Sequence, residues 1–159
     1  MKSKLTLLLA LTLLVISCED IENSELNLDV EILSISYGTY FGECYGYCSQ
    51  SIKIENDSIS YQAQSWSEND NYPLITYSTK FSEEYWKLLE EKIDFLIFRN
   101  LEEVIGCPDC ADEGAEWVEV ETEDITHKIT FEYNNPPEEI SNYIEDLSEL
   151  LSEFQEDIF

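Results

Sequence analysis

The stretch QSIKIENDSISYQAQ, residues 50–64, predicts a β-hairpin more clearly than any other part of this 159-residue chain. A two-residue turn at 56–57 would pair four apolar side chains across the two strands: Ile54 with Ile59, and Ile52 with Tyr61. Successive side chains of a strand point to opposite faces. These four side chains therefore share one face of the hairpin, and Lys53 and Ser60 lie on the other.

Strand and helix patterns follow one another on both sides of this hairpin. Apolar and β-branched residues predict further strands at 30–37 (VEILSISY), 74–79 (LITYST), 115–121 (AEWVEVE) and 125–133 (ITHKITFEY). Helices are expected at 81–98 and from Pro136-Pro137 to the C-terminus. This order predicts a single α+β domain over residues 30–159, with an antiparallel sheet and two helices packed on one face.

An apolar stripe at helical spacing is predicted on each of the two helices. Ser82 is the expected N-cap of the first helix, and its stripe is assigned to Tyr85, Leu88, Leu89, Lys92/Ile93 and Leu96. The stripe of the second helix is assigned to Ile140, Tyr143, Ile144, Leu147, Leu150, Leu151 and Phe154. Residues 105–114 between the helix and the next strand are expected to form a cysteine-bearing loop.

The N-terminus has the pattern of an export signal. Lys2 and Lys4 precede an apolar run at 5–16 that is too short to span a bilayer. The sequence Val-Ile-Ser-Cys at 15–18 resembles the lipobox of bacterial lipoproteins, which implies cleavage after residue 17 and lipidation, including a palmitate-type acyl chain, at Cys18. We expect an acidic tether at 18–29 and a domain anchored to the outer membrane of the cell envelope, on its periplasmic or its exposed side. The acidic stretch after Cys18 also resembles the surface-export signals of Bacteroidota lipoproteins.

Acidic residues dominate the rest of the chain. Without residues 1–17 it contains 35 acidic and six basic residues, a formal charge of −29. Nucleic-acid binding requires Lys and Arg to neutralise phosphates, so we predict no nucleic-acid partner. A basic protein partner or calcium would be attracted, although an acidic surface also serves simply to keep an exported protein soluble.

Four cysteines follow Cys18, namely Cys44, Cys48, Cys107 and Cys110. They are compatible with a zinc site, a thiol–disulfide redox centre or structural disulfides. Acidic residues around the GCPDC segment, with no helix expected directly after Cys110, disfavour a reactive thiolate. The exported location favours disulfides. Spacing alone leaves open whether they join neighbours or link the two pairs.

The segment Cys44-Tyr45-Gly46-Tyr47-Cys48 resembles the Cys-Phe-Gly-x-Cys-Pro motif of an uncharacterised domain family in Bacteroidota lipoproteins and related secreted proteins. The family's order of strand, motif, hairpin, helix, strand pair and C-terminal helix would cover residues 30–155. Ser49 replaces the motif's proline, and Cys107 and Cys110 are not part of the motif. The resemblance implies that Cys44 pairs with Cys48, and it carries no established activity.

A disulfide between Cys44 and Cys48 would hold a tyrosine-rich tip formed by Tyr40, Tyr45 and Tyr47. Tyrosine offers a large contact area at low entropic cost, so this tip is a candidate binding surface. The alternative is that these tyrosines pack over the edge of the sheet.

Catalytic patterns are weak. The only histidine, His127, falls on a predicted strand among apolar residues, where a structural role is expected rather than a catalytic one.

Weak calcium candidates are Asp109, Asp112, Glu113 and Glu116, with a second run at Glu68, Asn69, Asp70 and Asn71. Neither run has EF-hand spacing.

The sequence therefore predicts a lipid-anchored envelope protein that is not an enzyme, contains no cofactor and acts as an interaction module. The alternatives are a redox or other enzyme that uses Cys107 and Cys110, and a calcium- or zinc-binding lipoprotein.

Overall fold

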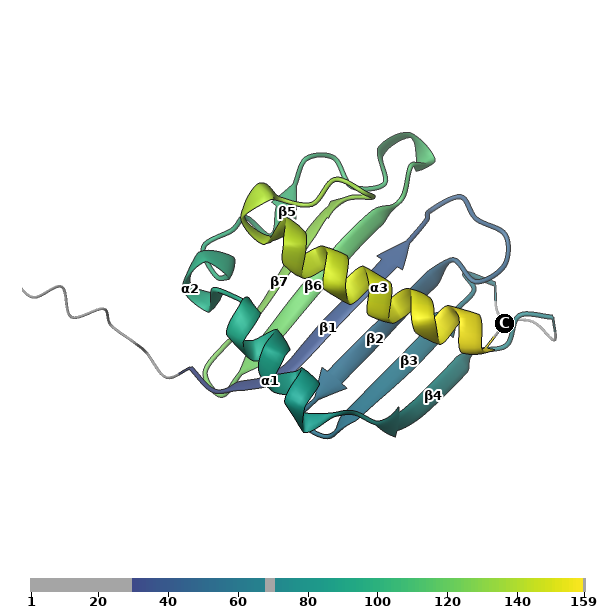
Figure 1. Cartoon of the computed structure of the whole chain (residues 1–159). Helices are drawn as coiled ribbons and strands as arrows, with labels where there is room; N and C mark the ends of the chain where they lie inside the picture. The colour runs from purple at the N-terminus through teal and green to yellow at the C-terminus, as the bar shows by residue number, and fades with distance from the viewer. Residues whose placement is uncertain (1–29, 68–70, 159) are drawn as a thin grey trace, which may run out of the picture.

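The computed structural model describes residues 30–67 and 71–158 and shows an α+β domain (Figure 1). Its main elements are β1 (Ile32–Tyr40), β2 (Ser49–Glu55), β3 (Ser58–Gln64), β4 (Ile75–Lys80), α1 (Glu83–Lys92), α2 (Phe95–Phe98), β5 (Val104–Ile105), β6 (Ala115–Thr122), β7 (Thr126–Glu132) and α3 (Ser141–Ile158). Short 3₁₀ turns lie at Cys110–Asp112 and Glu138–Ile140. The seven strands in these described ranges form one open sheet in the order β4-β3-β2-β1-β6-β7-β5.

The hairpin predicted at 50–64 is confirmed as β2 and β3, with the expected register. Ile54 pairs with Ile59, and Ile52 pairs with Tyr61. All four side chains are at most 1% exposed, whereas Lys53 is exposed on the other face. The alternation of apolar and polar residues therefore sets which face of the sheet receives the helices.

The C-terminal helix α3 covers that apolar face, and α1 lies on the same side of the sheet (Figure 1). The predicted stripe of α3 is confirmed, since its members are buried except for the half-buried Phe154. Leu147 lies near the middle of the helix and is fully buried. Burying this stripe against the sheet removes a large apolar area from water, which is the main term that holds the two layers together.

The helix predicted at 81–98 is wrong as a single helix, because it is divided into α1 and the one-turn α2. Ser82 caps α1 as expected, but Ile93 is extended. The carboxylate of Asp94 accepts a hydrogen bond of 3.0 Å from the N–H of Ile97 and so begins a new helical turn. Short acidic side chains favour such caps over helix interiors.

The break also changes which side chains of this segment face the core. Trp86, Leu89 and Ile93 are buried in α1 and at its end, and Phe95 and Phe98 are buried in α2. Tyr85, Leu88 and Leu96 of the predicted stripe are exposed. The predicted stripe is thus correct only at Leu89 and Ile93.

A short strand at the start of the loop expected at 105–114 was missed by the sequence patterns. β5 pairs in parallel with β7, Val104 opposite Thr130 and Ile105 opposite Phe131, and it ends the sheet on that side. A two-residue strand is too short to show a periodic pattern, so only its neighbour in the sheet defines it.

Candidate functional site

Two disulfides lie at one end of the sheet. Cys44 is bonded to Cys48 in the loop between β1 and β2, and Cys107 is bonded to Cys110 in the loop before β6. Both are local pairs, and the first of them is the pair that the motif resemblance implied. The two loops touch, because the N–H of Gly42 donates to a carboxylate oxygen of Asp109 at 3.0 Å. The structure thus brings together two cysteine segments that are about sixty positions apart in the chain.

The loop closed by Cys44 and Cys48 is tied to the sheet as well as to itself. The N–H of Phe41 donates to the carbonyl of Cys48 at 3.0 Å, and the N–H of Cys48 donates to the carbonyl of Gln64 at 2.9 Å. Cys48 is 1% exposed. Gly46 has φ of +108°, a conformation that side chains disfavour, and it allows the chain to turn within this short loop.

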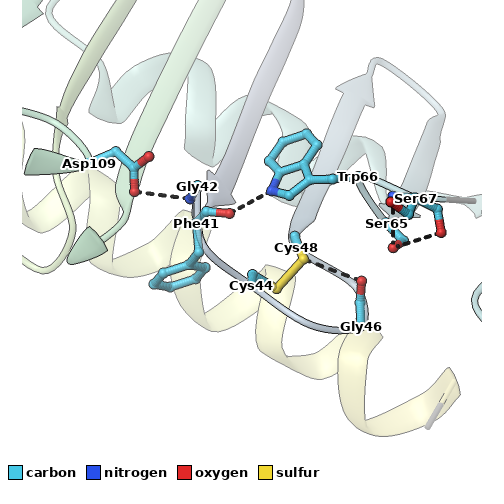
Figure 2. The surroundings of a disulfide bond; sticks show 9 residues. All are labelled: Phe41, Gly42, Cys44, Gly46, Cys48, Ser65, Trp66, Ser67 and Asp109. Atoms are coloured by element: carbon cyan, nitrogen blue, oxygen red, sulfur yellow. Dashed lines mark hydrogen bonds between the residues drawn. A yellow bond between two sulfur atoms is a disulfide. The ribbon is translucent and has the colours of Figure 1, made fainter. Parts of the chain in front are cut away.

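Trp66 and Asp109 hold the first residues of this loop from opposite sides (Figure 2). The indole N–H of Trp66 donates to the carbonyl of Phe41 at 2.7 Å. In addition, the ring of Phe41 meets the ring of Tyr133 edge to face, with centroids 5.0 Å apart. The loop is therefore fixed by the disulfide, by hydrogen bonds and by aromatic contacts.

The three tyrosines predicted to form one tip occupy different environments. Tyr45 is 88% exposed, but Tyr47 is half-buried and packs against the hydrophobic core. Tyr40 is half-buried at the end of β1. Burial, with a smaller effect from the nearby Tyr47 phenol, raises the pKa of Tyr61 to about 12. The two expectations for these tyrosines are therefore divided: Tyr45 is exposed as a binding tip requires, whereas Tyr47 packs against the core, as in the alternative.

The exposed ring of Tyr45 contacts Tyr72, which is not one of the predicted tip residues. Its ring meets that of Tyr45 at 5.3 Å and that of Tyr47 at 5.7 Å, both edge to face. Partial desolvation, together with these two phenols, raises the pKa of Tyr72. Sequence reasoning missed Tyr72 because only the β2–β3 pairing brings the segment after β3 beside the disulfide loop.

The loop closed by Cys107 and Cys110 differs in exposure and charge. Both cysteines are exposed, and the N–H of Cys107 donates to the carboxylate of Glu132 at 3.0 Å. Hydrogen bonds from the Asn135 side chain and from this backbone N–H lower the pKa of Glu132. A carboxylate at this position disfavours a thiolate at Cys107.

The backbone after Cys110 also lacks the helix that activates redox cysteines. A 3₁₀ turn does begin at Cys110, which differs from the expectation of no helix there. However, Asp109, Ala111 and Asp112 all have left-handed backbone conformations, so no regular α-helix follows. The helix N-terminus that lowers a cysteine pKa in redox motifs is therefore not formed at this loop.

The predicted calcium candidates do not converge. Glu116 is 4% exposed and points inward, where it accepts hydrogen bonds from the Tyr37 hydroxyl and from the N–H of Asn134, both at 2.9 Å. Asp109 is engaged with Gly42, and Asp112 and Glu113 are exposed. Within residues 30–67 and 71–158, no three acidic, histidine or cysteine side chains are grouped in a way that could hold a metal ion.

The remaining predicted positions are His127, Cys18 with its tether, and the second acidic run at 68–71. His127 is half-buried, with Nε2 3.2 Å from the carbonyl oxygen of Leu101 and its ring against Phe98, which supports the structural role expected for it. Burial, and then the negative charge of Glu116, raises the pKa of Tyr37 well above its usual range. Cys18 and the tether, and residues 68–70 of the second acidic run, lie outside the described residues.

Among the residues that the structure describes, no helix combines the length and the apolar character needed to cross a bilayer. Comparison with known proteins adds no relative: no protein-family model matches the chain, and no curated protein matches it.

Proposed function

We propose that this protein is an envelope lipoprotein, anchored through Cys18, whose domain binds a partner protein through the end of the sheet that carries the disulfides. We call this surface the disulfide end and define it by Tyr45, Tyr72, Trp66 and the two disulfide loops. The observation that carries the proposal is Tyr45, which is 88% exposed although it lies within a disulfide-closed loop. A large exposed aromatic side chain on a fixed loop binds at a low entropic cost.

The direction of β1 supports an orientation in which the disulfide end faces away from the membrane anchor. Residue 30, where the described domain begins, precedes β1 at the far end of the sheet from the disulfide loops (Figure 1). A nine-residue strand spans about 30 Å. An anchor at Cys18 would therefore leave the disulfide end pointing away from the membrane, where a partner can reach it.

Charge indicates the kind of partner. The whole chain has a formal charge of −27, and Asp109, Asp112 and Glu113 belong to one of the two loops that form the disulfide end. A surface of this composition suits a protein with a basic and aromatic patch, because opposite charges speed the encounter and aromatic contacts hold the complex.

Site-specific photocrosslinking in cells tests the binding surface. A benzophenone amino acid at position 45 or 72 should give a crosslinked product of the same mass from both positions. The control position is Asp124, in the turn between β6 and β7 near the opposite end of the sheet. Equal products from position 124, or none from positions 45 and 72, would contradict the proposal.

The anchor is tested separately by metabolic labelling with palmitate. The unchanged chain should incorporate label, and the Cys18→Ser variant should not. Incorporation by the variant would show that the acyl group is elsewhere.

A redox function of Cys107 and Cys110 is the second candidate, and the exposure of both cysteines is what favours it. The neighbouring Glu132 and the irregular backbone after Cys110 argue for a structural disulfide instead. We therefore propose that the protein is not an enzyme. Thiol titration distinguishes the two, because a reduced Cys107 with a pKa below that of a free thiol, together with turnover of a dithiol substrate, would establish the redox role.

A further inference from the structure

A second surface lies along the β4 edge of the sheet. It is a groove of about 530 Å³ between the start of α1, the C-terminal half of α3 and the edge strand β4. Its apolar lining comprises Ile59, Phe81, Tyr85, Leu150 and Phe154. We call it the edge groove. It shares no residue with the disulfide end.

The charged lining of the edge groove is mainly acidic. Glu149 and Glu153 of α3 line it, and Lys80 is the one basic residue among the described side chains that line it. Burial raises the pKa of Tyr85, and the negative charge of Asp146 raises it further; the Lys92 ammonium lowers it, and Glu153 and Glu149 raise it again. The apolar floor therefore lies in a negative field.

Among the residues that the structure describes, no strand pairs with the outer edge of the strand beside the groove. β4 is the terminal strand of the sheet and pairs with β3, so alternate backbone N–H and C=O groups point away from the sheet. Its sequence, ITYSTK, contains no proline, and its only charge is Lys80 at the end. Proline and charged side chains protect edge strands from pairing with other chains. An edge strand that lacks them along most of its length can accept a further strand from another chain.

The side of β4 that faces the helices leads into the groove. Tyr77 and Thr79 lie opposite Tyr61 and Ile59, so they share the helix-covered face. Thr79 lines the groove, and the ring of Tyr77 lies 6.1 Å from that of Phe154. A strand added to β4 would direct every second side chain toward this apolar and acidic lining.

We propose that β4 and the edge groove bind an extended peptide segment of a partner protein, which adds to the sheet and directs basic and aromatic side chains into the groove. Charge complementarity selects this occupant. A second copy of the chain would bring the same acidic residues, and the chain's own segment 18–29 contains five acids and no base. Both are repelled by Glu149 and Glu153.

A short synthetic peptide tests this directly. The probe is fluorescein-labelled Thr-Lys-Thr-Phe-Thr-Lys-Thr, which as a strand presents Lys, Phe and Lys on one face and threonine on the other. Anisotropy of the probe is followed against the purified full chain, with the same detergent solution as blank. We expect saturable binding, and none with the peptide in which glutamate replaces lysine.

Matched variants identify the site. Glu149→Gln with Glu153→Gln should weaken binding about tenfold, the effect of removing two rim charges. The control is Glu102→Gln with Glu103→Gln, which removes the same charge beside β5 at the opposite edge of the sheet and should change binding less than about twofold. Equal weakening in both variants would show adsorption to the overall charge and overturn the proposal.

Hydrogen exchange adds a readout that charge alone cannot produce. Bound peptide should slow amide exchange in β4 and leave exchange in β5 unchanged. No protection of β4 at saturating peptide would overturn strand addition. A chain that sediments as a dimer with β4 already protected before peptide is added would also overturn it, because the edge would be occupied by a second copy.

Discussion

The two disulfide loops lie side by side at one end of the sheet, yet they belong to the domain in different ways. Cys48 is 1% exposed and its backbone is bonded to β3, whereas Cys107 and Cys110 are exposed on an acidic loop. The same covalent bond therefore strengthens a packed part of the fold in one case and shapes a surface turn in the other. Closing such a short loop contributes a similar stabilising free energy in both cases. The surroundings of each bond therefore determine how much its loss destabilises the domain.

The largest expected effect is the loss of the buried bond. Replacing Cys44 and Cys48 by alanine should lower the free energy of unfolding by about 3 kcal/mol, from lost loop closure plus the cavity left at position 48. The matched change of Cys107 and Cys110 should cost about 2 kcal/mol, since it creates no buried cavity. Urea unfolding of both double variants measures the difference, and equal losses would remove the distinction between the loops.

The next effect lies within the Cys44–Cys48 loop. Tyr47→Ala should lower the free energy of unfolding by about 2 kcal/mol, because its ring packs against the core. Tyr45→Ala should change it by less than about 0.5 kcal/mol, since that side chain is 88% exposed. Thermal and urea unfolding of both variants separate the core tyrosine from the binding tyrosine. A large loss for Tyr45→Ala would mean that its contact with Tyr72 stabilises the domain.

A smaller effect is expected from Trp66→Phe, which removes the indole N–H that bonds to the carbonyl of Phe41. The expected cost is about 0.5 kcal/mol, and the Cys44–Cys48 bond should be reduced faster by dithiothreitol. The control is Trp117→Phe, whose ring lies on the other face of the sheet with the Lys128 ammonium 3.8 Å from its centroid. If both variants change the reduction rate equally, Trp66 has no specific role at this loop.

The smallest effect is a local pH dependence at the exposed loop. The pKa of Glu132 is lowered in the folded protein, so its contribution is present above its unfolded pKa of about 4.3 and is lost as pH falls through the lower folded value. Below that value the amide of Cys107 should exchange faster relative to its intrinsic rate. Glu132→Gln should abolish this pH dependence, and the amide of Cys48, bonded to a backbone carbonyl, should not show it.

Local patterns were sufficient for most of the sheet and for the last helix. The register of β2 and β3 and the buried stripe of α3 follow from the alternation of apolar residues, which a single segment contains in full. The division of the helix at 81–98 was missed because Asp94 can continue a helix or cap a new one. Packing of Ile93 and Phe95 into the core favours the second choice.

The candidate site depended more on contacts between distant segments. The motif resemblance implied the Cys44–Cys48 pair, but the roles of Tyr47, Tyr72 and Glu116 were not predictable. Tyr47 turns inward, Tyr72 arrives from beyond β3, and Glu116 is bonded to Tyr37 on the neighbouring strand. None of these contacts has a signal within its own segment.

The sequence by itself determined the α+β class, the apolar face of the sheet and the concentration of cysteine and tyrosine in residues 40–48, because these depend on residue type and short-range spacing. The tertiary structure decided that the two disulfide loops meet, that Tyr45 remains exposed while Tyr47 is covered, and that α1, α3 and β4 enclose an acidic groove. The physical reason is that exposure and proximity are properties of the packed sheet: the order β4-β3-β2-β1-β6-β7-β5 places remote segments together, and burial then selects which side chains stay available to a partner.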